Sequence, residues 1–220
     1  MSLTALAGGV IAALFATPAS AGFTVPPNAP GQYAPRDECS AQPGGAEFLA
    51  RLKDAAKARD AVSLALLASP KVMLDFGGGS GRDEMVRRFV PGSDLWQELD
   101  KALALGCAFD KDNSALVVPW FFAQDLGDSD PFGTSVTLGK AVPLYKAGSA
   151  KSAVLKQLNW QLVVNRDTDE IGSPFIPVAV IDSDLVGYVE MERLRSPLAY
   201  RLRAEKVDGK WQIASFLAGE

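Results

Sequence analysis

Asp75 and the glycines that follow it are the residues whose types and spacing most directly indicate chemistry. An apolar run over residues 72–74 leads into Asp75, and glycines occupy positions 77, 78, 79 and 81. A glycine-rich turn exposes backbone N–H groups, which can bind an anion. The sequence therefore predicts a candidate anion-binding loop, composed of Gly78, Gly79, Ser80 and Gly81.

The same stretch, DFGGGSG, resembles the first motif of the S-adenosylmethionine-dependent methyltransferases. Such a site also needs a crossover helix and a second strand ending in an acidic residue that binds the ribose hydroxyls. Asp94 lies only 13 residues past Gly81. That spacing leaves no room for a second strand, because a parallel crossover takes on the order of a dozen residues. We interpret the motif as a strand-to-helix turn and expect no cofactor.

Other catalytic classes are limited by what the composition lacks. The chain has no histidine, which excludes Ser-His-Asp and Cys-His catalysis and histidine zinc sites. Its two cysteines have no C-x-x-C spacing, so thiolate zinc frameworks are excluded. We therefore assign no catalytic residue and no metal site. Catalysis by carboxylates such as Asp75 stays open as an alternative.

The first 21 residues carry no charge, and their apolar run ends in the A-x-A pattern at Ala21. This pattern predicts a signal peptide over residues 1–21. A retained membrane anchor is the alternative, although the run is short for a span of about 20 residues. We expect a periplasmic or secreted protein with no stable membrane span after signal cleavage.

Export changes the interpretation of Cys39 and Cys107, because thiols form disulfides in an oxidising compartment. We predict a disulfide between them, and a loop of this length is stabilised by about 4 kcal/mol on the chain-entropy model. The alternative is two separate buried thiols.

The region before residue 126 is expected to form an arm and then an α+β domain. Residues 22–46 hold five prolines and four glycines and read as a Pro/Gly-rich linker or arm. Residues 47–125 are expected to be the α+β domain. Its predicted helices and strands cover residues 47–68, 71–76, 82–89, 94–105 and 115–122.

Beyond residue 135 the pattern changes to short apolar runs separated by turns. The runs lie at residues 141–145, 153–158, 160–164, 175–181 and 185–191. Residues 135–195 resemble bacterial Src-homology-3 domains. The resemblance is carried by Val142, Leu144, Tyr145, Ser149, Ser152, Val154, Leu155, Leu158, Gly187, Tyr188, Val189 and Leu194. It implies a small all-β barrel and, in secreted proteins, attachment to peptidoglycan or envelope proteins.

Aromatic side chains on such a barrel can line a groove for an extended peptide. Tyr145, Trp160 and Tyr188 are the candidate ligand-binding residues of this groove. The alternative is that all three rings belong to the core or its rim.

Residues 196–220 end the chain with two alternating segments joined by Asp208 and Gly209, a strong hairpin signal. The hairpin is expected to pack on either domain. This ending and the paired helices also resemble nuclear-transport-factor-2-like α+β domains. The barrel is then either an insertion before the final hairpin of that domain, or a separate domain with an added hairpin.

The charge balance limits the partners. Twenty-six acidic and 22 basic residues give a net charge of −4, which argues against nucleic-acid binding. We expect an α+β, secreted, non-enzymatic cell-envelope protein that binds peptide, peptidoglycan or a partner protein through the barrel. The alternative is small-molecule binding or carboxylate-based catalysis in an N-terminal α+β pocket.

Overall fold

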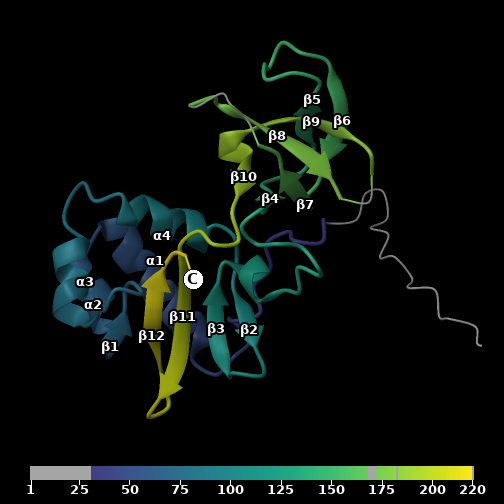
Figure 1. Cartoon of the computed structure of the whole chain (residues 1–220). Helices are drawn as coiled ribbons and strands as arrows, with labels where there is room; N and C mark the ends of the chain where they lie inside the picture. Colours follow the sequence, from purple (N-terminus) through teal and green to yellow (C-terminus); the bar gives the residue numbers. More distant parts are fainter. Residues whose placement is uncertain (1–30, 168–171, 182, 220) are drawn as a thin grey trace, which may run out of the picture.

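The computed structural model describes residues 31–167, 172–181 and 183–219 (Figure 1). The predicted signal peptide, residues 1–21, lies outside the described residues. In the part of the chain that is described, no helix has the length and apolar character needed to cross a membrane. The fold is α+β, as predicted, with a few helices and two mostly antiparallel sheets.

The first sheet has the strand order β1-β12-β11-β3-β2, and α1 to α4 lie beside it (Figure 1). Its strands and helices in chain order are α1 (Gly45–Ala58), α2 (Ala61–Leu66), β1 (Ala68–Met73), α3 (Arg82–Arg88), α4 (Leu95–Leu103), β2 (Ala108–Asp110), β3 (Ala115–Val118), β11 (Arg201–Val207) and β12 (Lys210–Leu217). The predicted hairpin around Asp208 and Gly209 is confirmed as β11 and β12. It lies in the first sheet, where β12 also pairs in parallel with β1.

The strands of the second sheet follow β3 and precede β11 in the chain. Their order in the sheet is β10-β4-β7-β8-β9-β5-β6. Its strands are β4 (Thr134–Thr137), β5 (Val142–Tyr145), β6 (Val154–Leu158), β7 (Leu162–Asn165), β8 (Phe175–Val180), β9 (Val186–Glu190) and β10 (Leu194–Arg195). The expected barrel needs a correction, because this sheet is not closed. The short strand β10 pairs with β4, and among the described residues nothing joins it to β6 at the other edge.

The local sequence explains the two N-terminal helices. One face of α1 is apolar and buried, and the helix ends at Arg59, whose φ of 53° is left-handed. Asp60 then caps α2 by accepting hydrogen bonds from the N–H groups of Val62 and Ser63. The helical stretch predicted over residues 47–68 is thus divided at Asp60 into two helices. Pro70 lies inside β1, which tolerates proline because it is an edge strand.

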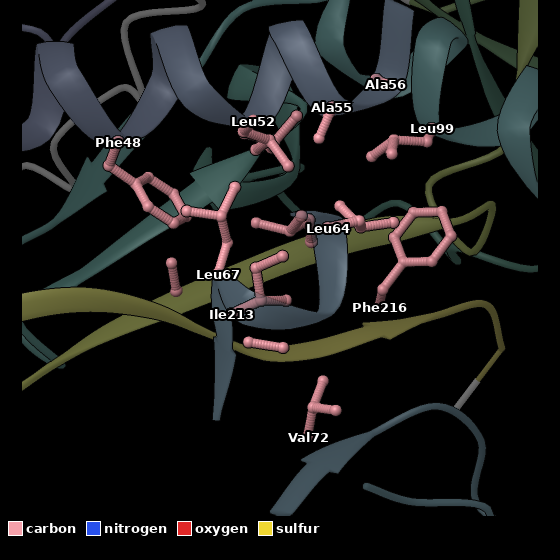
Figure 2. Close-up of a cluster of buried hydrophobic side chains, with 14 of the residues drawn as sticks. Phe48, Leu52, Ala55, Ala56, Leu64, Leu67, Val72, Leu99, Ile213 and Phe216 are labelled. Atoms are coloured by element: carbon pink, nitrogen blue, oxygen red, sulfur yellow. The ribbon is translucent and has the colours of Figure 1, made fainter. Parts of the chain in front are cut away.

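Apolar side chains fill the space between the helices and the first sheet. Leu52, Leu64 and Ile213 are each fully buried, and Figure 2 shows side chains from α1, α2 and β12 pointing toward one another. Phe89 contacts both Trp96 and Phe216, with ring centroids 4.7 and 5.7 Å apart. The interior of this domain is thus a packed core.

The predicted disulfide between Cys39 and Cys107 is confirmed, and it fastens the arm to the first sheet. The backbone of the arm pairs beside it, because Cys107 N–H donates to Arg36 and Glu38 N–H donates to Cys107. The Glu38 carboxylate accepts a hydrogen bond from the Trp120 indole N–H at 2.9 Å. Residues 31–44, within the predicted linker, therefore pack against the folded chain.

A second buried group, here called the junction cluster, joins the two sheets. It consists of Tyr33, Leu105, Ala108, Trp120, Phe121, Val136 and Leu162. Its members come from the arm, the turn after α4, β2, the 3₁₀ turn after β3, and strands β4 and β7. The arm and both sheets therefore share one apolar contact region.

Candidate functional site

Three aromatic side chains gather on neighbouring strands of the second sheet. Tyr145 in β5 is the register partner of Tyr188 in β9. The Phe175 ring, from β8, meets the Tyr145 ring edge to face, with centroids 5.8 Å apart. We call Tyr145, Phe175 and Tyr188 the aromatic cluster. Tyr145 is buried, at 8% exposed, whereas Tyr188 and Phe175 are half-buried.

A loop of small residues lies against this cluster. Gly148 is exposed, and a β-carbon added there would lie 3.5 Å from the Tyr188 ring and 3.6 Å from Phe175. The loop holds its shape through its own hydrogen bonds, including Lys146 N–H to Ala153 and Ala147 N–H to the Ser152 hydroxyl. The rings are thus bordered by a polar turn with little side-chain bulk.

Trp160, the third predicted groove residue, lies elsewhere. It follows β6 near the Val142 end of β5, while Tyr145 occupies the other end of that strand. Its partly buried ring packs against the junction cluster, and its carbonyl accepts a hydrogen bond from Tyr33 N–H. The structure therefore brings Tyr145 and Tyr188 together and leaves Trp160 out.

Sequence reasoning missed Phe175 as a member of the cluster. Phe175 begins a predicted apolar run, and nothing in its local pattern distinguishes it from a core residue. Its position beside Tyr145 follows from the β8-β9-β5 order, which is a long-range property. The one local signal was the small turn around Gly148, which leaves room beside an aromatic ring.

The anionic group that the glycine loop binds is the carboxylate of its own Asp75. The Asp75 carboxylate accepts hydrogen bonds from Gly77 and Gly79 N–H groups, both at 2.8 Å, and pairs with the Arg88 guanidinium. Gly81 N–H donates to the Val72 carbonyl, and Ser80 bridges to Met73. Two of the predicted donors, from Gly79 and Gly81, are therefore engaged within the protein, which fits the turn interpretation of this motif.

These contacts set the charge state of the loop. The Gly79 hydrogen bond first, and then Arg88, lower the pKa of Asp75 below its ordinary value. Arg88 also bonds Glu84 at 2.7 Å and lowers the pKa of that carboxyl. Both acids are therefore ionised and paired at neutral pH, a state suited to holding the loop rather than to transferring protons.

The surface hollows of the first domain are shallow. One of about 310 Å³ lies between α1 and α2 and includes Asp54 and Asp60. Both acids are exposed, and Asp60 is occupied in capping α2. Within the described residues no aspartate or glutamate is buried, and no group of His, Cys, Asp or Glu is arranged to hold a metal ion.

Comparison with known proteins does not assign the chain to a family. No protein-family model matches it, and no curated protein matches it.

Proposed function

We propose that this chain is a secreted, non-enzymatic cell-envelope protein that binds peptidoglycan through the aromatic cluster. The Cys39–Cys107 disulfide supports an oxidising compartment, because such bonds persist outside the cytosol. The resemblance of residues 135–195 to bacterial Src-homology-3 domains supports an envelope role. The predicted periplasmic or secreted location belongs to the same proposal.

The observation that carries the proposal is the convergence of Tyr145, Phe175 and Tyr188 beside Gly148. Tyr188 and Phe175 are partly exposed, and aromatic residues offer flat apolar surface, with a polar tip on tyrosine, that extended peptides and similar chains can contact. Gly148 adds no side chain over the ring of Tyr188, since even a β-carbon there would lie 3.5 Å from it. Peptidoglycan supplies ligands of this kind, as short peptides on glycan strands.

The alternative, a small-molecule or catalytic pocket in the N-terminal domain, has less support. The interior of the N-terminal domain is occupied by apolar side chains, and Asp75 is paired with Arg88. A general acid or base is usually placed in a cleft where its pKa is tuned toward the working pH. The pKa of Asp75 is shifted downward, away from neutral pH.

Sedimentation with purified, insoluble peptidoglycan tests the proposal. We expect the wild-type chain to be retained in the pellet, and Tyr188→Ala to lose most of that retention. Tyr188→Phe keeps the ring and is expected to keep most of it. No retention of the wild type would remove the wall-binding role.

Phe132→Ala is the matched control for this measurement. Phe132 is 70% exposed and lies outside the aromatic cluster, so it reports on general adhesion of aromatic surface. Its retention is expected to equal that of the wild type. Equal losses in Phe132→Ala and Tyr188→Ala would contradict a specific site.

A further inference from the structure

The hairpin of β5 and β6 is strongly basic in an acidic protein. Between Asp130 and Asp167 the sequence has no aspartate or glutamate, while the whole chain has a net charge of −4. Four lysines lie along the hairpin and its entry, at Lys140, Lys146, Lys151 and Lys156. We call residues 140–158 the basic hairpin.

The charges of the basic hairpin are not neutralised locally. Each of its lysines is exposed, and none forms an ion pair with another described residue. Elsewhere acidic residues stand near basic ones and some of these charges are paired, as in Lys101 with Glu98 and Arg59 with Asp100. Because the hairpin's charges share one sign and one location, they attract an anionic partner.

β6 is the last strand at one edge of the second sheet (Figure 1). Val154, Leu155, Lys156 and Gln157 are all exposed, with Val154 51% and Leu155 41% accessible. β5 occupies one side of this strand, and no described residue pairs with the other. An edge of this kind has backbone N–H and C=O groups available for an added strand.

We propose that the β6 edge binds an extended acidic polypeptide segment as an added strand. Backbone hydrogen bonds to β6 hold the segment, and apolar side chains contact Val154 and Leu155. Its carboxylates pair with Lys151 and Lys156. Pairing with the same strand of a second copy is disfavoured because it brings lysines against lysines, and like charges across strands are unfavourable.

This inference does not rest on the proposed function, because it uses backbone and lysines rather than the aromatic rings. Fluorescence anisotropy with labelled decapeptides of alternating valine and glutamate tests it on the chain without its predicted signal peptide. We expect saturable binding that weakens as salt is added. A control decapeptide of alternating valine and lysine is expected not to bind. No saturable binding of the valine–glutamate peptide overturns the proposal.

Charge reversal locates the site. Lys151→Glu/Lys156→Glu is expected to weaken binding about tenfold or more, whereas Lys71→Glu/Lys111→Glu changes it little. Lys71 and Lys111 are exposed residues of the first sheet and its β2–β3 turn, so the control makes the same charge change elsewhere. Equal effects of the two pairs overturn the proposal.

Two further probes test strand addition itself. In an extended peptide, the N–H groups of alternate residues point to opposite sides, and only one side can face β6. We therefore use two peptides, one methylated on the odd-numbered and one on the even-numbered nitrogens, and at least one of them must lose binding. If both methylated peptides bind as well as the parent, the proposal fails. Vesicles of phosphatidylglycerol report on a lipid surface, and binding to vesicles without binding to the acidic peptide also overturns it. Tyr188→Ala is expected to bind the peptide, which separates this outcome from failure at the aromatic cluster.

Discussion

Asp75 shows how a single side chain can decide the meaning of a motif. Glycines placed after a strand offer N–H donors, and in a nucleotide-binding protein these donors meet a ligand. Here the carboxylate of Asp75 takes the donors of Gly77 and Gly79, and Arg88 balances its charge. The loop is thereby fixed as the turn between β1 and α3.

The paired carboxylate predicts a pH-dependent stability effect. Because the folded-state pKa of Asp75 is lowered, its stabilisation is present above the unfolded pKa of about 3.9 and is lost as pH falls through the folded pKa. Asp75→Asn is expected to lower the urea midpoint at pH 7, and the deficit narrows as the pH approaches 3. Urea denaturation at both pH values measures this.

Asp83→Asn is the control for that pH effect. Asp83 is exposed in the first turn of α3 and forms no ion pair with a described residue. We expect a smaller change in urea midpoint at pH 7. A deficit for Asp75→Asn as large at pH 3 as at pH 7 contradicts the role given to the charge.

At the scale of elements, two neighbouring contacts hold the arm against the first sheet. Gly106 has φ of 79°, and a β-carbon there would lie 2.2 Å from the Arg36 carbonyl oxygen. The adjacent Cys107 carries the disulfide to Cys39. Both restraints act on the short stretch of the arm that pairs beside β2.

Gly106→Ala is expected to be strongly destabilising, by about 3 kcal/mol, because it adds left-handed strain and displaces the arm backbone. Gly209→Ala has a similar φ of 77° but open space around it, so about 1 kcal/mol is expected. Chemical denaturation compares the two. Equal losses would mean that the close contact with the arm contributes nothing.

The disulfide is expected to contribute measurably to the same docking. The pair Cys39→Ser/Cys107→Ser should lower the free energy of unfolding by about 2–4 kcal/mol, because it restores the entropy of a long loop to the unfolded chain. Urea denaturation without reductant measures this, with the reduced wild type as comparison. An unchanged midpoint in the double variant would contradict the expectation.

Elements with a strong local pattern were predictable from the sequence, and their partners were not. The runs at 141–145, 153–158 and 175–181 correspond to β5, β6 and β8, and the buried stripe of α1 was visible in its spacing. The parallel pairing of β1 with β12 was not, since residues far apart in the chain form it. The short strands β2, β4 and β10 also lacked a periodic signal.

The same distinction applies to the aromatic cluster. Tyr145 and Tyr188 were identified by residue type, and Phe175 joined them only through the strand order. Trp160 lies apart from them: its backbone is left-handed, with φ of 44°, and its ring packs against the junction cluster. Which aromatic residues meet is therefore a tertiary property.

At the scale of the whole molecule, the second sheet is inserted in the chain between β3 and β11, two neighbouring strands of the first sheet. The junction cluster packs the arm, the turn after α4 and strands of both sheets together. The aromatic cluster and the basic hairpin both belong to the second sheet, on strands outside that contact. Under the proposed function, the first sheet and its helices are the base on which the second sheet presents its binding surface.

Calorimetric titration with soluble peptidoglycan fragments tests this account most directly. The wild-type chain is expected to bind them saturably, and Tyr188→Ala to bind about tenfold more weakly or not at all, because a partly exposed aromatic residue is removed from the cluster. Phe132→Ala is expected to match the wild type. Absence of saturable binding by the wild type, or equal affinity for Tyr188→Ala, would contradict the proposed role of the aromatic cluster.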